Sequence, residues 1–371
     1  MKSRAIFLFL VFLTAIYAVF NFSFLKSEVS GKAESLKAAF LNYEKTITRE
    51  EKKISLAFVG DIMLDRGVKS VIQKHGGGDY NYPFILITPF LKSFDFVFAN
   101  LEGPVSQMGV NRGSIYSFRM SPDSAQALRS ANFGIVSVAN NHIGDWGEEA
   151  MKDTLDFLTE NEVQYVGGGM NQYEAYSPRI VNIKGTKIAF LAFSQFGAGY
   201  TEAIGNKIGI AVIDTEKIKR SIAVAVNGSD VVVVSYHFGD EYKKEPNDFQ
   251  KKFARLAIDS GADIVIGHHP HVVEPVEKYL HGYIAYSLGN FVFDQNFSKE
   301  TIESFILEAD IEDNSVVGLK KHPVKINSFF QPELAGKPEI FLIKLQLGRR
   351  NPSRILQSSF LSFPQALRFS E

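Results

Sequence analysis

Apolar runs that alternate with amphipathic stretches dominate the middle of the sequence. The six apolar runs that we interpret as strands are Ile54–Gly60, Phe94–Asn100, Phe133–Asn140, Lys187–Phe193, Asp230–Tyr236 and Ala262–His268. Runs that are hydrophobic throughout are typical of sheets covered on both faces. The intervening stretches Ser121–Ala131, Gly147–Asn161 and Asn247–Gly261 have the spacing of amphipathic helices. This alternation predicts an α/β fold with helices layered on the sheets.

The pattern changes after Tyr283, where strand-like segments follow one another with little helix between them. These segments are YIAYSLGNFVF, ESFILEADIE, SVVGLKKHPVKI and IFLIKLQL. Short connections favour antiparallel pairing. We therefore expect these segments to pair mostly antiparallel and to complete a second sheet.

The composition limits the classes of function. The chain has 371 residues, of which 45% are hydrophobic, and a net charge of −1. This length provides for a sizeable core, and the charge balance gives no reason to expect a nucleic-acid partner. The sequence contains no cysteine, which excludes disulfides, thiolate metal sites and a cysteine nucleophile. Any metal site must therefore use oxygen and imidazole ligands.

The N-terminal segment has the properties of a membrane anchor. The run Ala5–Leu25 carries no charge, and Lys2 and Arg4 precede it. At about 1.5 Å per residue, a helix over this run would cross the roughly 30 Å hydrocarbon layer. Basic residues on the N-terminal side favour a cytoplasmic N-terminus, so we predict that residues 1–25 form a single-pass anchor with the rest of the chain outside the cytoplasm. A cleaved signal peptide followed by secretion is the alternative.

Three further segments complete the predicted organisation. Residues 26–53 are polar and mixed in charge, and we interpret them as a linker. The globular part begins at Ile54. The last residues, 348–371, have no pattern that assigns them to an element.

Polar residues that could bind metals follow five of the predicted strands. They are Asp61, then Asn100 and Glu102, then Asn140, Asn141 and His142, then His237, and finally His268, His269 and His271. In open α/β sheets, ligands bind beyond the carboxyl ends of the strands, and neighbouring strands lie about 4.8 Å apart. We therefore expect these side chains to converge on one site. His269 and His271 are the most specific pair, because residues i and i+2 of an extended segment point to the same side.

The residue types in this set point to divalent cations. Carboxylate, amide and imidazole groups without thiolate suit Mn²⁺, Fe²⁺ or Zn²⁺, and hydrolases use pairs of such ions about 3.5–4 Å apart. Each residue taken singly also has a structural explanation. His142 and His237 could be structural histidines, and Asp61 a helix N-cap. Asn100 and Asn140 could be turn residues, but the agreement of five strand ends favours a metal site.

Six segments, five of which contain these residues, resemble the CapA family of capsule-synthesis or poly-γ-glutamate biosynthesis proteins. The segments are FVGDIMLDRGV, ANLEGPVS, SVANNHIGDWG, HFGDEY, GHHPHVVEPVE and YSLGNFVFDQ, in the order of the family. The resemblance extends over residues 54–347. The family is itself similar to the calcineurin-like metallophosphoesterases. The resemblance implies a metallophosphatase-like four-layer sandwich of two mixed β-sheets flanked by helices, with the N-terminal transmembrane helix outside it.

The resemblance also implies roles for the polar residues. The implied metal ligands are Asp61 and His271 for one ion, Asn141, His237 and His269 for a second, and Glu102 as a bridge between them. His142 is the implied catalytic residue, and Asn100, Asn140 and His268 would support the ligands without binding metal. Arg66 and Arg119 are candidates for binding an anionic substrate, with ordinary surface arginines as the alternative. Met63 stands where the phosphoesterases carry a histidine.

From this resemblance we expect a membrane-anchored, extracytoplasmic, metal-dependent hydrolase in capsule or poly-γ-glutamate biosynthesis. It would use one or two divalent ions (Mn, Fe or Zn) on an anionic polymer or a phosphate ester. Its expected partners are the membrane, through the N-terminal helix, and the polymer synthase or export subunits. The first alternative is a non-catalytic export or assembly subunit of a polymer synthase. The second is a general phosphoesterase that acts on nucleotides or phosphorylated lipids.

Overall fold

The computed structural model describes residues 17, 34–35, 37–38 and 53–342. The chain divides into two compact units, Met1–Lys53 and Ile54–Glu371. Apart from a few single positions, the predicted anchor and linker lie outside the described residues, as does the segment 348–371. Among the residues that are described, no helix is both long enough and apolar enough to cross a membrane.

Residues 53–342 contain a nine-stranded mixed sheet. Its strands are β1 (Ile54–Ile62), β2 (Phe96–Leu101), β3 (Phe133–Ser137), β4 (Gln164–Val166), β13 (Asn290–Val292), β14 (Glu303–Glu312), β15 (Ser315–Ile326), β16 (Pro332–Leu334) and β17 (Glu339–Leu342). The order is β16-β15-β14-β1-β2-β3-β4, with β13 beside β1 and β17 beside β15. Strands β1 to β4 run parallel, and β14 to β17 pair antiparallel.

The same range contains a six-stranded mixed sheet. Its strands are β6 (Arg179–Ile183), β7 (Thr186–Ser194), β9 (Val231–His237), β10 (Ile264–His268), β11 (Val276–Tyr279) and β12 (Gly282–Ala285). The order is β11-β12-β10-β9-β7-β6, with a parallel centre and antiparallel edges. A two-stranded sheet joins β5 (Gly168–Gly169) to β8 (Gly209–Ile210).

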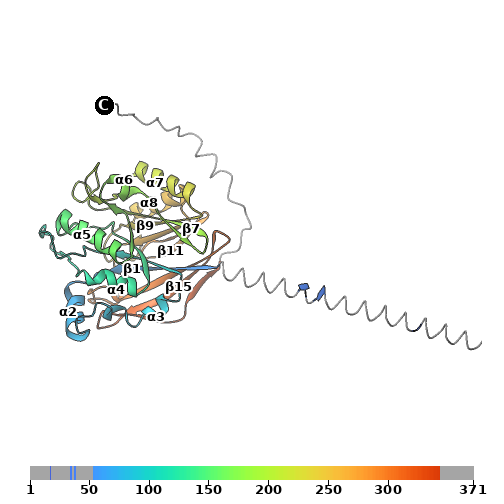
Figure 1. Cartoon of the computed structure of the whole chain (residues 1–371), viewed down its shortest axis with the longest axis horizontal. Coiled ribbons are helices and arrows are strands. Elements are labelled where there is room, and N and C mark those ends of the chain that lie inside the picture. Colours follow the sequence, from blue (N-terminus) through green and yellow to red (C-terminus); the bar gives the residue numbers. More distant parts are fainter. Residues whose placement is uncertain (1–16, 18–33, 36, 39–52, 343–371) are drawn as a thin grey trace, which may run out of the picture. The chain divides into compact units, whose positions relative to one another are not determined.

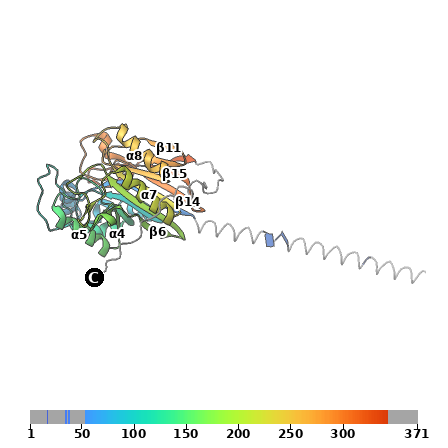
Figure 2. The same ribbon diagram turned by 90° about the horizontal axis from the view of Figure 1, so that it is seen from above.

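Helices cover these sheets. They are α2 (Arg66–His75), η1 (Tyr82–Phe84), α3 (Thr88–Leu91), α4 (Asp123–Ser130), α5 (Gly147–Glu160), α6 (Gln172–Tyr176), α7 (Thr215–Gly228), α8 (Asp248–Asp259) and α9 (Lys299–Ile302). In Figure 1, α6, α7 and α8 lie beyond the six-stranded sheet, whereas α2 and α3 lie on the opposite side of the strands. Helices α7 and α8 contact one another and the strands beneath them, and Figure 2 shows this layer from above.

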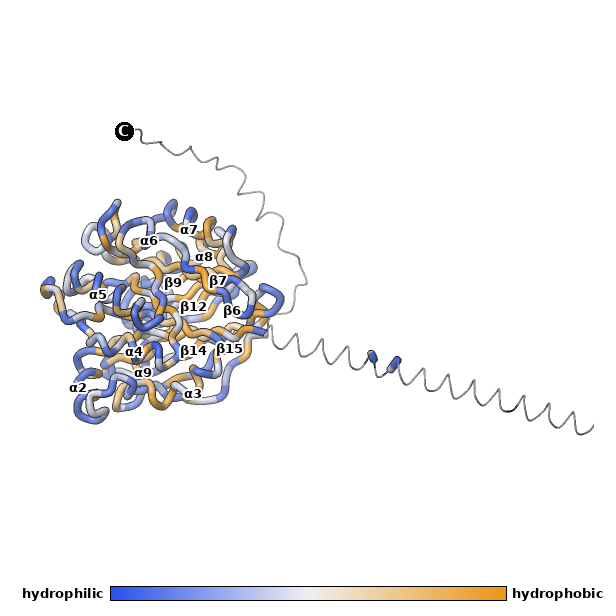
Figure 3. Tube along the Cα trace, in the orientation of Figure 1, coloured by the Kyte–Doolittle hydropathy of each residue, from blue (hydrophilic) through white to orange (hydrophobic). Residues whose placement is uncertain are grey.

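The two large sheets face each other through alternate side chains. Phe98 of β2 stacks on Phe190 of β7, with ring centroids 5.9 Å apart. On β9, Val233 shares a core with the nine-stranded sheet, whereas Val234 shares a separate core with α7 and α8. Because both faces are buried, these strands are hydrophobic at most positions on either face, as predicted. The hydrophobic colour of β7, β9 and β12 shows this in Figure 3.

The segments after Tyr283 correct one prediction. Segment YIAYSLGNFVF divides at Gly289, whose φ is 76°: β12 before it pairs parallel with β10, and β13 after it pairs parallel with β1. Strands β14 and β15 form the expected antiparallel pair, but β14 joins β1. The prediction of a second sheet is therefore wrong for β13 to β17, because pairing partners depend on long-range packing that a local pattern does not contain.

Candidate metal centre

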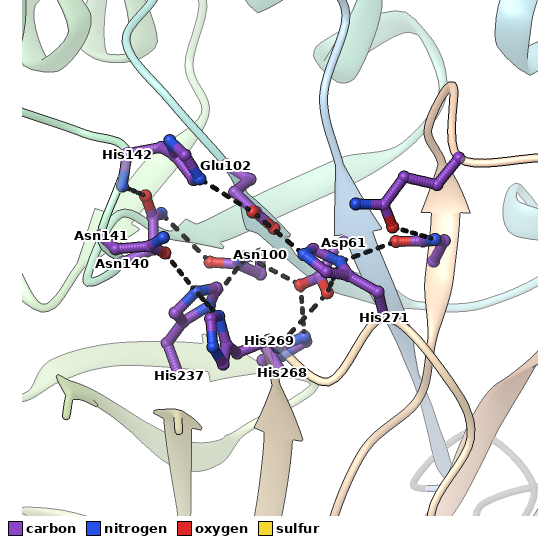
Figure 4. Close-up of polar contacts among 12 residues, drawn as sticks. Asp61, Asn100, Glu102, Asn140, Asn141, His142, His237, His268, His269 and His271 are labelled. Carbon is purple, nitrogen blue, oxygen red and sulfur yellow. Dashed lines mark hydrogen bonds and ion pairs between the residues drawn. The ribbon is translucent and has the colours of Figure 1, made fainter. Parts of the chain in front are cut away.

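The carboxyl ends of the parallel strands bring the predicted site residues together (Figure 4). From the nine-stranded sheet come Asp61 near the end of β1, Asn100 and Glu102 at the end of β2, and Asn140, Asn141 and His142 in the loop after β3. From the six-stranded sheet come His237 at the end of β9, His268 at the end of β10, and His269 and His271 just after β10. All of them are buried except Asn141, which is partly exposed. The site thus lies where the strand ends of the two large sheets meet.

Two glycines allow the chain to approach itself closely at this point. A Cβ on Gly60 would lie 1.8 Å from the carbonyl oxygen of Gly289, and a Cβ on Gly267 would lie 1.8 Å from that of Tyr286. No side chain fits at either position. These glycines directly precede Asp61 and His268, so the close backbone contacts position both site residues.

One group of possible ligands surrounds His271. Its Nδ1 lies 3.3 Å from Oδ2 of Asp61, and its Nε2 lies 3.6 Å from Oε1 of Glu102. Asp61, Glu102 and His271 each offer a ligand atom within 4.8 Å of the others. Because protein ligands lie about 2.0–2.2 Å from such ions, this spacing suits a shared cation after small side-chain movements.

The tautomer of His271 follows from its other contact. Its Nδ1 also lies 2.9 Å from Oδ1 of Asn290, a residue of β13 that the sequence analysis missed. Two oxygen acceptors beside Nδ1 favour a proton on that nitrogen. The lone pair of Nε2 is then available to a metal, an arrangement that is usual for ligating histidines.

The second predicted ligand group is also close together. Nε2 of His237 lies 2.7 Å from Oδ1 of Asn141 and 3.2 Å from Nδ1 of His269. These three residues come from three separate strand ends. Two imidazole nitrogens and an amide oxygen in such contact form a donor set suited to a borderline divalent ion.

Asn100, Asn140 and His268 connect these groups. Asn100 Nδ2 donates to Oδ1 of Asp61 at 2.8 Å and lies 3.3 Å from Nδ1 of His237. Asn140 donates to Asn100 at 3.3 Å, and its Oδ1 accepts from the backbone N–H of His142 at 3.1 Å. His268 Nδ1 lies 3.3 Å from Oδ1 of Asp61. The three side chains therefore hold the neighbouring site residues in place.

Glu102 provides the test of whether a cation fits. Its side chain is fully buried, and neither carboxylate oxygen has a hydrogen-bond partner among the described residues. Burial raises the pKa of Glu102 well above its usual value. Its nearest polar contacts are Nε2 of His271 at 3.6 Å and Nε2 of His142 at 3.8 Å, which are too long for hydrogen bonds, whereas a buried carboxylate normally has a closer partner or a metal. The residues present therefore fit a divalent cation at this point.

Three further titratable groups at the site, His269, His271 and Asp61, have shifted pKa values. Burial lowers the pKa of His269 to about 3, with His271 adding to the effect. Burial also opposes charge on His271, but Glu102 and Asp61 raise its pKa to about 9. Although burial alone would raise it, the rings of His268 and His271, each with Nδ1 3.3 Å from the carboxylate, hold the pKa of Asp61 well below its usual value. The carboxylates thus draw positive charge into the site.

His142 is held by a partner that the sequence analysis missed. Its Nδ1 lies 2.8 Å from Oδ2 of Asp145, which also accepts from the backbone N–H of Phe118 at 2.9 Å. The Nε2 of His142 faces the site, 3.8 Å from Oε1 of Glu102. The i, i+3 spacing of HIGD was a local signal for this pair.

The backbone at the histidine pair differs from the prediction. His269 has φ 96° and His271 has φ 58°, so the segment is a turn and not an extended strand. Such left-handed conformations cost about 1–3 kcal/mol each and concentrate at functional sites. The side chains converge because of this turn, and the i, i+2 argument from strand geometry was wrong.

The two arginines make contacts of their own. Arg66 donates to both carboxylate oxygens of Asp294 and lies 5.1 Å from the centre of the Phe118 ring, which contacts His142. Arg66 is therefore near the site. Arg119 stacks on Trp146 at 3.5 Å and donates to backbone carbonyls. Its guanidinium is thus used within the protein.

Comparison with known proteins identifies the family. The family described as "Bacterial capsule synthesis protein PGA_cap" matches residues 55–295. The chain belongs to this family. Two relatives of the capsule synthesis family support the assignment. The "Capsule biosynthesis protein CapA" of Bacillus anthracis is 32% identical over 75% of this chain and 69% of its own length. The "PGA biosynthesis protein CapA" of Bacillus subtilis is 34% identical over 80% and 76%.

Two solved structures resemble the fold distantly. A phosphatase from Mycoplasma pneumoniae has a TM-score of 0.40 at 13% identity, and covers 78% of this chain and 93% of its own. The NAD nucleotidase of Haemophilus influenzae has a TM-score of 0.45 at 13% identity, and covers 76% and 60%.

Proposed function

We propose that this protein is a metal-dependent hydrolase that acts outside the cytoplasm during the biosynthesis of a capsule or of poly-γ-glutamate. The observation that carries the proposal is the convergence of two buried carboxylates and three buried histidines at one strand-end site. Family membership supports the biological process, because two relatives carry names of capsule and PGA biosynthesis proteins. The substrate class is an anionic polymer or a phosphate ester.

The predicted roles become part of this proposal. Asp61 and His271 would hold one ion, Asn141, His237 and His269 a second, and Glu102 would bridge them. When bound, divalent ions of the Mn, Fe or Zn type would polarise a substrate oxygen and lower the pKa of water. In its doubly protonated form, His142 would donate from Nε2 to negative charge that develops on the substrate, with Asp145 accepting from Nδ1 and fixing the orientation of the ring.

Arg66 is the better of the two candidates for an anionic substrate. Its guanidinium is partly exposed, with 34% of the side chain accessible, and is oriented by Asp294. Arg119 is occupied by Trp146 and by backbone carbonyls. We therefore expect Arg66 to contribute more to substrate binding.

The rest of the proposal concerns architecture and location. We propose that residues 54–347 form a four-layer sandwich of the metallophosphatase type, with residues 1–25 as a membrane anchor and 26–53 as a linker. The uncharged run behind Lys2 and Arg4 supports the anchor. Synthase or export subunits in the same membrane would be its partners.

The test is metal analysis of the purified full-length chain together with hydrolysis assays. A panel of phosphate esters is set against γ-glutamyl isopeptide oligomers, with His237→Ala as the variant that disrupts the site. We expect bound divalent metal and turnover of one substrate class, both lost in the variant. Bound metal without any turnover would contradict the hydrolase and favour a non-catalytic subunit of a polymer synthase.

A further inference from the structure

Glu241 lies beside the two histidines that follow β10. It belongs to the segment after β9, and its side chain is exposed, whereas His269 and His271 are buried. One carboxylate oxygen of Glu241 and one ring nitrogen of each histidine all lie within 4.8 Å of one another. An oxygen and two imidazole nitrogens at this spacing form a possible cation site that the strand-end argument did not predict.

The backbone fixes the position of Glu241 relative to these histidines. On one side of it, the N–H of Phe238 donates to the carbonyl oxygen of His268 at 3.1 Å. On the other side, the N–H of Tyr242 donates to the carbonyl oxygen of Pro270 at 2.8 Å. These two hydrogen bonds join the segment after β9 to the turn that carries the histidines. The backbone therefore holds Glu241 close to the two histidines, whichever rotamer its side chain adopts.

A third contact restrains the backbone of this segment. The N–H of Gly239 donates to Oε1 of Gln195 at 2.9 Å, and a Cβ on Gly239, whose φ is 100°, would lie 2.5 Å from the side chain of Gln250. The segment therefore packs tightly on both sides of its turn. A ligand on such a preorganised segment loses little conformational freedom when it binds a cation.

The two candidate ligand groups share His271 and approach it from different environments. Asp61 and Glu102 are fully buried, whereas Glu241 is exposed. Because Nδ1 of His271 faces Asn290 and Asp61, its Nε2 is the nitrogen that remains for a cation. A carboxylate that reaches this position from the solvent can complete a coordination shell that the buried residues leave open.

We propose that Glu241 is a further carboxylate ligand of this metal centre, beside His269 and His271, and that it closes the centre on its solvent side. The proposal rests on the metal centre of the proposed function and adds a residue to it. Carboxylate and imidazole together suit Mn²⁺, Fe²⁺ or Zn²⁺.

The test uses Mn²⁺ alone and the full-length chain, without any substrate. Mn²⁺ affinity is measured by equilibrium dialysis for the wild type, Glu241→Gln and Glu245→Gln. Glu245 is the matched control, because it is an exposed glutamate of the same segment. We expect Glu241→Gln to weaken Mn²⁺ binding about 10–100-fold, on the scale of losses around metal sites, and Glu245→Gln to change it less than twofold.

A second measurement separates ligation from long-range charge. Co²⁺ replaces Mn²⁺, and its visible absorption reports the ligand set. We expect Glu241→Gln to change the Co²⁺ spectrum, Glu241→Asp to retain a carboxylate with an intermediate affinity, and Glu245→Gln to leave the spectrum unchanged.

The outcomes separate this inference from the proposed function. If the wild type binds no Mn²⁺, the proposed metal centre and this inference both fail. If the wild type binds Mn²⁺ and His269→Ala does not, but Glu241→Gln matches the wild type in affinity and Co²⁺ spectrum, only this inference is overturned. Equal weakening by Glu241→Gln and Glu245→Gln, with unchanged spectra, would also overturn it, because that result indicates charge and not coordination.

Discussion

Among single residues, Glu102 is the one whose buried carboxylate most needs a positively charged partner. Its carboxylate is fully buried and accepts no hydrogen bond among the described residues, while Nε2 atoms of His142 and His271 lie 3.8 and 3.6 Å away. Leaving a charge in such a place is costly unless a counter-ion accompanies it. A cation bound beside Glu102 would therefore explain the burial of its carboxylate.

The first prediction compares Glu102→Gln with Asn141→Ala. We expect Glu102→Gln to reduce bound metal more, because a bridging carboxylate neutralises charge on two ions and an amide does not. The measurement is metal stoichiometry after dialysis against a defined Mn²⁺ concentration. Greater metal loss in Asn141→Ala would show that Glu102 does not bridge.

The second prediction concerns the pair His142 and Asp145. His142→Ala should leave the metal bound but lower kcat about 10²–10³-fold, as is typical when one contact to developing charge is lost. Asp145→Asn should also retain metal and lower kcat, because an amide lacks the negative charge with which Asp145 stabilises positive charge on the His142 ring. Metal stoichiometry and kcat with its pH profile check both variants. A His142→Ala protein without metal would make His142 a ligand and contradict this division of roles.

At the scale of elements, β14 and β15 carry a partly buried charge cluster. Glu308 of β14 is 8% exposed. The Oε2 atom of Glu308 lies 2.6 Å from Nε2 of His322 on β15, and its Oε1 accepts a hydrogen bond from Lys320. The His322 ring packs on Phe90. Burial would raise the pKa of Glu308, but hydrogen bonds from His322 and Lys320 lower it to about 2. The cluster connects the two strands across their ladder.

The third prediction is the pH dependence that follows from this shift. The pKa of Glu308 is about 2 in the folded protein, against an ordinary value of 4.5. The unfolded chain therefore binds more protons between these pH values, so the stabilisation is present above about pH 4.5 and is lost as the pH falls towards 2. Glu308→Gln should lower the free energy of unfolding by about 1–3 kcal/mol at pH 7 and flatten this acid dependence.

The control for this prediction is Glu303→Gln on the same strand. Glu303 lies 3.5 Å from Lys299 in a pair whose side chains are 47% and 77% exposed. Exposed pairs contribute about 0–1 kcal/mol, so this variant should unfold almost as the wild type. Denaturant unfolding at pH 7 and pH 3 measures both variants, and an unchanged acid dependence in Glu308→Gln would contradict the assignment.

For the whole molecule, the site depends on two sheets that meet at their strand ends. Residues of β1 and β2 contact histidines that follow β10, which belongs to the other sheet. Separation of the sheets would therefore dismantle the site. Folding of the domain and formation of the metal centre should be coupled, as is common for metal sites.

The fourth prediction concerns location. Expressed full-length, the chain should sediment with membranes and resist extraction by high salt, because the uncharged run Ala5–Leu25 would span the bilayer. External protease should reach the domain in spheroplasts. Fractionation followed by N-terminal sequencing checks this, and a soluble mature chain that begins near residue 20 would support signal cleavage instead.

Much of the fold class and of the site was determined by the sequence itself. Runs that are hydrophobic at most positions are typical of strands buried on both faces, and the structure confirms a mixed α/β fold with helices on the sheets. The polar residues that follow the predicted strands are residues that the structure brings together. The absence of cysteine restricted the ligands to oxygen and imidazole. These inferences succeed because periodicity and residue type are local properties.

Only the tertiary structure decided which strands share a sheet, which residues orient the site histidines and which further residue lies beside them. Strands β13 and β14 join β1, Asn290 and Asp145 orient histidines, and Glu241 reaches the site from a neighbouring segment. The left-handed turn at His269 and His271 is likewise absent from the strand pattern. The physical reason is that these features depend on contacts between residues far apart in the chain, such as Asp61 and His271, which local periodicity does not encode.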